Sequence, residues 1–166
     1  MIDIIKQRVL ETANELSARK LMLATAESCT GGGLSYWLTS VPGSSLWFER
    51  GFVTYSNTAK IEMLNVSENT LNQQGAVSEE TAIEMAEGIK QKSHADMGIA
   101  ITGIAGPDGG SSTKPVGTVW LAFSGKHFNT IAQHYVFNGD RQAVRLACMA
   151  KALEQLLIIV KNTFPI

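Results

Sequence analysis

The sequence predicts an α/β domain in which a mixed sheet lies between layers of helices. Helical and strand-like segments alternate through the first part of the chain, which is typical of strands joined by helices. A neighbouring pair of strand-like segments follows late in the chain, and this pair makes the predicted sheet mixed. With 166 residues, 45% of them hydrophobic, the chain is predicted to form one domain over residues 1–166.

The first elements are a helix, a strand and a second helix. An amphipathic helix is predicted because apolar residues recur at helical spacing, at Ile5, Val9, Ala13 and Leu16. The short apolar run 21–26 predicts a buried strand. A helix over 34–38 follows and is predicted to end near Val41, where Pro42-Gly43 marks a turn.

The middle of the chain continues the alternation. Residues 52–55 predict a second strand, and residues 56–58 supply the N-cap of a short helix that carries Lys60. Ser78 and the two glutamates after it open a clear helix, which the spacing of its apolar residues supports. Residues 97–102 predict a third strand.

The last part of the chain combines a long loop, two strands and a helix. The loop 103–117 holds five of the fifteen glycines and two of the four prolines. Segments 118–123 and 131–137 predict the strand pair, and Asp140 is expected to cap a final helix that runs to about Lys161. A loop of this length in a compact domain is usually functional.

The strand-to-helix turn at residues 26–33 carries the most chemistry. Two hydroxyls, a thiol and three glycines lie where backbone N–H groups and a helix dipole would face a ligand. Ser28 is either a nucleophile there or simply a helix N-cap, a task that Thr30 could also perform. Ligands of α/β sheets bind outside the carboxyl ends of strands, so this turn, Tyr55, Thr102 and the long loop are expected to meet at one edge.

A nucleophilic serine needs a base. The three histidines, His94, His127 and His134, stand in no distinctive motif, which makes a serine–histidine–aspartate triad a poor fit. Lys60 is the better candidate if burial lowers its pKa, and the alternative is a solvated surface lysine. Cys29 is a second candidate nucleophile, or a small buried residue.

The composition argues against several kinds of partner. A net charge of −1 offers no basic surface for nucleic acid, and the longest apolar run, 156–160, is too short to cross a bilayer. Two cysteines and no signal-peptide pattern indicate a reducing cytoplasm without a structural disulfide. Histidine, cysteine and carboxylate residues show no metal-ligand spacing, so we expect neither a metal nor another cofactor.

Several motifs in one order resemble the competence/damage-inducible CinA C-terminal domain family over nearly the whole chain. The matching segments are 25–32, 43–45, 47–57, Lys60, 75–78, 102–110, 114–119 and 139–141. The resemblance implies a three-layer α/β/α domain in homo-oligomers, as dimers or larger assemblies. It also implies hydrolysis of the amide of nicotinamide mononucleotide (NMN) to nicotinate mononucleotide and ammonia. We expect no fused second activity, because the sequence lacks the N-terminal pyrophosphatase-like domain of longer relatives.

The family's site residues carry over onto matching positions. The resemblance implies that Ser28 is the nucleophile, that Lys60 is the base of a Ser-Lys mechanism without metal, and that Tyr55 assists proton transfer. It implies a substrate-binding set of Thr30, Gly31, Gly32, Thr102, Gly103 and Arg141. Arg145, one helical turn from Arg141 on the same face, is an alternative to it.

The physical chemistry of amide hydrolysis fits these residues. A serine must lose its proton while the carbonyl is polarised, and the N–H groups of Thr30 and Gly31 are the expected oxyanion donors. A glycine loop and an arginine suit a nucleotide phosphate. Two alternatives are an amidase for another pyridine amide and a non-catalytic nucleotide-binding or interaction module linked to competence or DNA damage.

Overall fold

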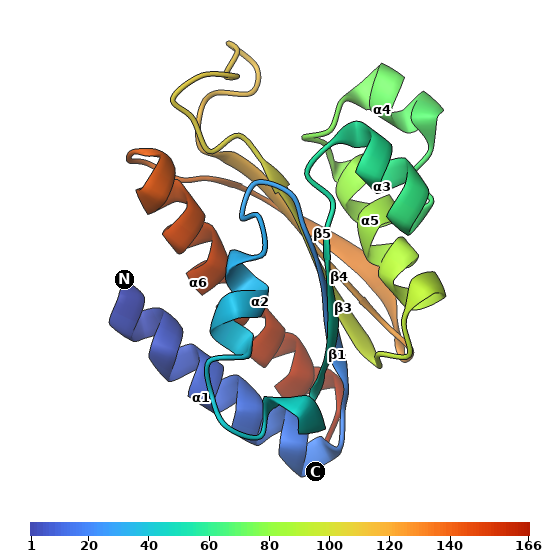
Figure 1. Ribbon diagram of the computed structural model, residues 1–166, viewed down its shortest axis with the longest axis vertical. Helices are drawn as coiled ribbons and strands as arrows, with labels where there is room; N and C mark the ends of the chain where they lie inside the picture. The colour runs from blue at the N-terminus through green and yellow to red at the C-terminus, as the bar shows by residue number, and fades with distance from the viewer.

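The structure, a computed structural model, describes all residues from 1 to 166. Helices cover both faces of one five-stranded sheet (Figure 1). The elements in chain order are α1 (Ile2–Arg19), β1 (Leu23–Glu27), α2 (Gly33–Leu38), a 3-10 turn η1 (Ser44–Leu46), β2 (Phe48–Val53), α3 (Asn57–Leu64), α4 (Glu68–Gln74), α5 (Glu79–Lys92), β3 (Met97–Gly103), β4 (Thr118–Gly125), β5 (Phe128–Val136) and α6 (Arg141–Thr163).

The sheet is mixed, as the sequence predicts. Its strand order is β2-β1-β3-β4-β5. β1 pairs in parallel with both β2 and β3, whereas β4 runs antiparallel to β3 and to β5. Helices α1, α2 and α6 lie on one face, and α3, α4 and α5 lie on the other (Figure 1). This arrangement confirms the α/β/α layers.

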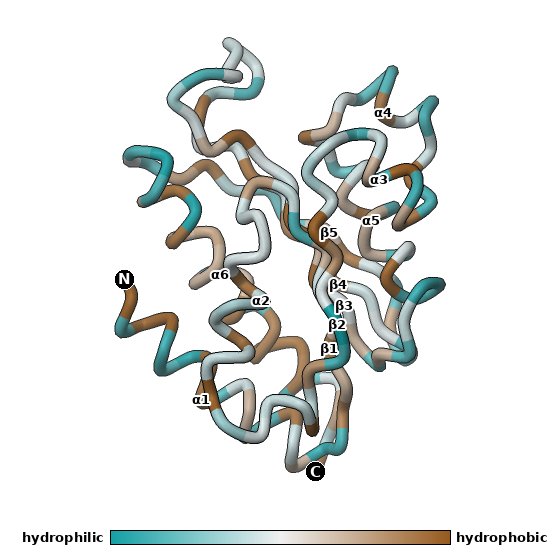
Figure 2. Tube along the Cα trace, in the orientation of Figure 1, coloured by the Kyte–Doolittle hydropathy of each residue, from teal (hydrophilic) through white to brown (hydrophobic).

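Each face of the sheet has its own apolar core. Successive side chains of a strand point to opposite faces. Leu23 of β1 therefore packs in the larger core with α1, α2 and α6, and Ala24 and Ala26 pack in the smaller core with α3 and α5. Hydrophobic residues follow the strands and the inner sides of the helices, whereas the loop between β3 and β4 projects beyond the layers and is mostly hydrophilic or neutral (Figure 2). None of the helices combines the length and the apolar character that a membrane span needs.

Serine and aspartate caps set the helix starts. The side chains of Ser56, Ser78 and Asp140 accept hydrogen bonds from backbone N–H groups in the first turns of α3, α5 and α6, which confirms three predicted caps. Helix α4 has no counterpart in the sequence prediction, because only Leu71 of its seven residues is buried. Its one signal is Ser67, which caps it in the same way.

Some predicted boundaries are wrong. β2 begins at Phe48 instead of residue 52, because Glu49 to Gly51 interrupt the apolar pattern of this edge strand. β5 begins at Phe128 instead of residue 131. Helix α2 ends at Leu38 instead of near Val41, and turns connect it to η1. The site is unaffected, because each strand ends close to its predicted residue.

Candidate active site

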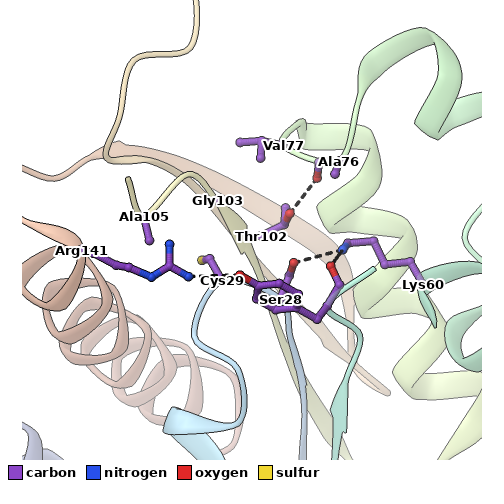
Figure 3. Close-up of a pocket in the computed structure, with 10 residues that line it drawn as sticks. Ser28, Cys29, Lys60, Ala76, Val77, Thr102, Gly103, Ala105 and Arg141 are labelled. Carbon is purple, nitrogen blue, oxygen red and sulfur yellow. Dashed lines mark hydrogen bonds between the residues drawn. The ribbon is translucent and has the colours of Figure 1, made fainter. Parts of the chain in front are cut away.

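The carboxyl ends of the three parallel strands converge on one pocket, as the sequence predicts. Ser28 directly follows β1, Tyr55 comes shortly after β2, and Thr102 lies at the end of β3. The pocket has a volume of about 250 Å³. Its lining residues are Ser28, Cys29, Tyr55, Lys60, Ala76, Val77, Thr102, Gly103, Ala105 and Arg141 (Figure 3).

Ser28 is free of the capping task. The N-cap position of α2 is occupied by Gly32, and no side chain at that position accepts a hydrogen bond. Neither Ser28 nor Thr30 caps the helix, so the N-cap interpretation of both residues is wrong. The backbone N–H of Ser28 donates to the Ile101 carbonyl of β3 at 3.0 Å, which anchors the residue at the sheet edge. Its Oγ lies 3.0 Å from the Nζ of Lys60 (Figure 3).

Lys60 is a buried lysine, with 1% of its surface exposed. The Ser56 cap starts α3 so that Lys60, in its second turn, points at the end of β1. Besides Ser28, its Nζ contacts the carbonyl oxygens of Thr54 at 2.9 Å and Tyr55 at 3.3 Å. No carboxylate forms an ion pair with it. Burial lowers the pKa of Lys60, because a desolvated ammonium is disfavoured. The surface-lysine interpretation is therefore wrong.

Tyr55 and Arg141 close one side of the pocket. The Arg141 guanidinium donates to the Tyr55 hydroxyl at 3.1 Å and to the Gly106 carbonyl at 2.8 Å. Tyr55 is 61% exposed, and Arg141, the first residue of α6, is also exposed. These two side chains therefore stand at the solvent side of the pocket, while Lys60 is at its buried side.

Arg145 has a different position from Arg141. Its guanidinium donates to the Thr30 carbonyl at 2.9 Å, and it is absent from the pocket lining. It lies beneath the turn that follows β1, close to the backbone of Gly31 and Gly33. One helical turn on α6 thus separates an arginine at the pocket from an arginine that supports the turn.

The family model described as "CinA C-terminal domain" matches residues 6–160. The chain belongs to the CinA C-terminal domain family. It is 52% identical over 146 residues to a protein named nicotinamide-nucleotide amidohydrolase PncC from Escherichia coli (strain K12), covering 88% of each chain. A protein of the same name from Pseudomonas putida is 50% identical over 156 residues, which are 94% of this chain and 97% of that one.

A solved structure has the same fold as this CinA domain. The structure of competence/damage inducible protein CihA from Agrobacterium tumefaciens superposes with a TM-score of 0.92 at 43% identity. The match covers 94% of this chain and 95% of that chain. The resemblance seen in the motifs is therefore confirmed along the whole domain.

The predicted glycine turn of the CinA domain lies behind the pocket. Thr30 is fully buried, and neither it nor Gly31 and Gly32 lines the pocket. The Gly31 N–H donates to the Ser28 carbonyl at 3.0 Å, so its expected role as an oxyanion donor is wrong. The N–H groups of Cys29 and Thr30 have no acceptor in the chain. Both glycines have φ in the left-handed region, at 57° and 90°, which this tight turn requires.

The connection between α4 and α5 forms a wall that the sequence did not reveal. Ala76 and Val77 line the pocket opposite Arg141 (Figure 3). The Thr102 hydroxyl donates to the Ala76 carbonyl at 2.7 Å, which ties this connection to the end of β3. The signals in the sequence were that residues 75–77 precede the Ser78 cap and that segment 75–78 matches the family, but neither indicated a pocket wall. From the long loop, only Gly103 and Ala105 reach the lining.

The two cysteines lie together in the larger core, and Cys29 also lines the pocket. A hydrogen bond between the thiols, together with burial, raises the pKa of Cys148 well above its usual range. Lys60 hydrogen-bonds Ser28 and not Cys29. The position of Lys60 therefore favours Ser28 over Cys29 as the candidate nucleophile. No group of three histidine, cysteine or carboxylate side chains is arranged to hold a metal ion.

Proposed function

We propose that this CinA domain hydrolyses the amide of NMN to give nicotinate mononucleotide and ammonia. The hydrogen bond between Ser28 Oγ and Lys60 Nζ at 3.0 Å, inside a pocket, carries the proposal. Two relatives of about half-identical sequence, from E. coli and P. putida, are named nicotinamide-nucleotide amidohydrolase. The name and the nucleophile–base pair support the same chemistry.

The contacts of Lys60 suit a general base. A neutral amine has two N–H donors and one lone pair. The Thr54 and Tyr55 carbonyls can accept the two N–H bonds, so that the lone pair faces the hydroxyl of Ser28. Ser28 Oγ then attacks the amide carbonyl carbon while its proton moves to Lys60 Nζ. Collapse of the tetrahedral intermediate breaks the C–N bond, and Lys60 returns the proton to the departing ammonia. Lys60 then takes a proton from a water molecule, which attacks the acyl ester, and the Ser28 oxygen leaves and regains a proton.

The oxyanion of the tetrahedral intermediate needs hydrogen-bond donors near Ser28. The N–H groups of Cys29 and Thr30 directly follow the nucleophile and have no acceptor in the chain. Of the two residues only Cys29 lines the pocket, so we assign the oxyanion site to the Cys29 N–H in place of Gly31.

Arg141 is the group that we assign to the nucleotide phosphate. It is the one charged side chain of the lining besides the buried Lys60, and it lies at the solvent side. A guanidinium can bind phosphate through two parallel N–H bonds. The hydroxyl of Tyr55 accepts a hydrogen bond from Arg141. We assign to Tyr55 the task of assisting proton transfer between Ser28 and Lys60. Thr102 shapes the wall near Ala76.

We further propose that the protein acts in the cytoplasm as a homo-oligomer, without metal, nucleic acid or membrane. A near-neutral net charge of −1 supports the absence of nucleic acid. The chemistry of the lining supports a metal-free reaction, because it contains no carboxylate and no imidazole.

Ammonia release from NMN by the purified protein, measured with and without a strong chelator, tests this function. We expect equal turnover in both conditions and no turnover by Ser28→Ala. Loss of activity that a divalent ion restores would refute the metal-free mechanism. Faster release of ammonia from another pyridine amide would show that this amide, and not NMN, is the preferred substrate. Binding of NMN without any ammonia would favour a non-catalytic nucleotide-binding module.

A further inference from the structure

Glu27 is a buried carboxylate next to the proposed nucleophile, and the proposed mechanism does not use it. It is fully buried at the end of β1. No lysine or arginine forms an ion pair with it. A buried charge is costly unless hydrogen bonds satisfy it, so its retention here calls for an explanation.

Four donors from the turn and from α2 satisfy this carboxylate. Oε2 accepts from the Thr30 hydroxyl at 2.6 Å and from the Leu34 N–H at 2.9 Å. Oε1 accepts from the N–H and from the hydroxyl of Ser35, both at 2.8 Å. Glu27 is thus a side-chain acceptor shared by the nucleophile turn and the helix after it.

The backbone donors identify the task of Glu27. Leu34 and Ser35 are the second and third residues of α2, and their N–H groups are the ones that an N-cap side chain normally accepts. The N-cap residue, Gly32, has no side chain to do so. Glu27 therefore caps α2 from the preceding strand, and its negative charge lies at the positive end of the helix.

The side chain of Ser28 has no part in this cap. A serine in a strand-to-helix turn would ordinarily turn its hydroxyl to the helix N–H groups. Glu27 takes those groups here, and the side chain of Ser28 lies on the opposite face of the sheet, where its Oγ has Lys60 as its hydrogen-bond partner. The bond from Thr30 also holds the turn that carries the N–H groups of Cys29 and Thr30.

We propose that Glu27 is a positioning residue for catalysis: it caps α2 in place of Gly32, which has no side chain, and it fixes the turn so that the serine faces its base. This inference rests on the proposed function, since it assumes that Ser28 is the nucleophile. It predicts that loss of the hydrogen bond from the Thr30 hydroxyl to Glu27 lowers turnover. Loss of the bond from the Ser35 hydroxyl should lower stability alone.

Glu27→Gln is the direct test, because it keeps the shape and places an NH2 group against backbone donors. We expect kcat for NMN to fall by about tenfold or more while KM changes by less than about threefold. The pKa in the pH–rate profile should not move, because Lys60 lies on the other face of the sheet. A folded Glu27→Gln protein with wild-type kcat would overturn the proposal.

Two matched variants separate positioning from stability. Thr30→Val and Ser35→Ala each remove one hydroxyl donor to Glu27, on opposite oxygens. We expect both to lower Tm, only Thr30→Val to lower kcat, and Ser35→Ala to keep kcat within about twofold of wild type. Equal kcat losses would make Glu27 merely structural. This comparison also decides the question if Glu27→Gln fails to fold.

A substrate-free measurement distinguishes failure of this inference from failure of the proposed function. Labelling by a fluorophosphonate, in which Ser28 Oγ attacks phosphorus and fluoride leaves, reports the reactivity of the serine. We expect the rate to fall in Glu27→Gln and Thr30→Val and to stay at the wild-type level in Ser35→Ala. If wild type is labelled at Ser28 but releases no ammonia from NMN, only the substrate assignment fails. If Ser28 is not labelled and NMN is not turned over, both the proposed function and the positioning role of Glu27 fail.

Discussion

Glu27 and Ser28 are adjacent in the chain, yet their side chains bond to helices on opposite faces of the sheet. Glu27 accepts hydrogen bonds from α2, whereas Ser28 contacts Lys60 of α3. The alternation of side chains along a strand produces this separation. The bonds that cap the helix and the bond to the proposed base are thereby divided between two residues.

Removal of the Ser28 hydroxyl should abolish turnover at little cost in stability. Because Ser28 does not cap α2, Ser28→Ala should change the free energy of unfolding by less than about 1 kcal/mol. We expect kcat for NMN to fall by about 10⁴-fold or more. Parallel measurements of ammonia release and of urea unfolding check both values. Near-normal turnover in the folded variant would refute Ser28 as the nucleophile.

The lowered pKa of Lys60 predicts how activity depends on pH. Only the neutral amine can accept the proton of Ser28, so kcat/KM should rise with pH through the folded-state pKa of Lys60. Lys60→Arg should be as inactive as Lys60→Met, because arginine keeps its proton. Substantial activity of Lys60→Arg would instead indicate a role in charge pairing. A pH–rate profile of wild type and both variants provides the measurement.

The same pKa makes a prediction for stability. Between its lowered folded-state value and the unfolded value near 10.5, the unfolded chain binds more protons at Lys60 than the native chain does. Stability contributed at this site therefore rises with pH across that window and is constant below it. The Tm of wild type relative to Lys60→Met should rise as the pH increases toward 10.5. A Tm difference independent of pH would contradict the burial effect.

The two arginines of α6 should have separable effects. Arg141→Ala removes the cation at the solvent side of the pocket, so KM for NMN should increase by about tenfold or more with a small change in Tm. Arg145→Ala removes the bond to the Thr30 carbonyl. It should instead lower the free energy of unfolding by about 1–2 kcal/mol, and Tm should fall with it. Steady-state kinetics and thermal melts of both variants distinguish the two roles. A rise in KM for Arg145→Ala together with a loss of stability for Arg141→Ala would assign the phosphate to Arg145 instead.

The loop from residue 103 to 117 is expected to become ordered when ligand binds. Its glycines lose much backbone freedom on ordering, and Pro107 and Pro115 reduce that loss. Gly103 and Ala105 line the pocket, and the Gly106 carbonyl accepts a bond from Arg141. A bound nucleotide would therefore contact the base of the loop. Hydrogen exchange over residues 103–117, with and without nicotinate mononucleotide, should reveal added protection; unchanged exchange would leave the loop a rigid connection.

Local signals in the sequence were sufficient for most of the helices and strands and for the place where the pocket forms. Apolar spacing and the caps at Ser56, Ser78 and Asp140 predict the main helices, because both are contacts within a few residues. The rule that ligands bind at the carboxyl ends of strands predicts that Ser28, Tyr55 and Thr102 meet. Helix α4 and the early start of β2 escaped prediction, since their residues lack a regular apolar pattern.

Only the tertiary structure decided which partners each side chain has there. The sequence determined by itself that a serine and a glycine turn follow one strand and that a lysine lies in the short helix after the next strand, but it left capping and catalysis open for Ser28. Burial of Lys60 and the separation of Arg141 from Arg145 depend on helices that pack against the sheet from distant parts of the chain. A desolvated pKa and a hydrogen bond between remote residues are properties of packing, and no local pattern encodes them.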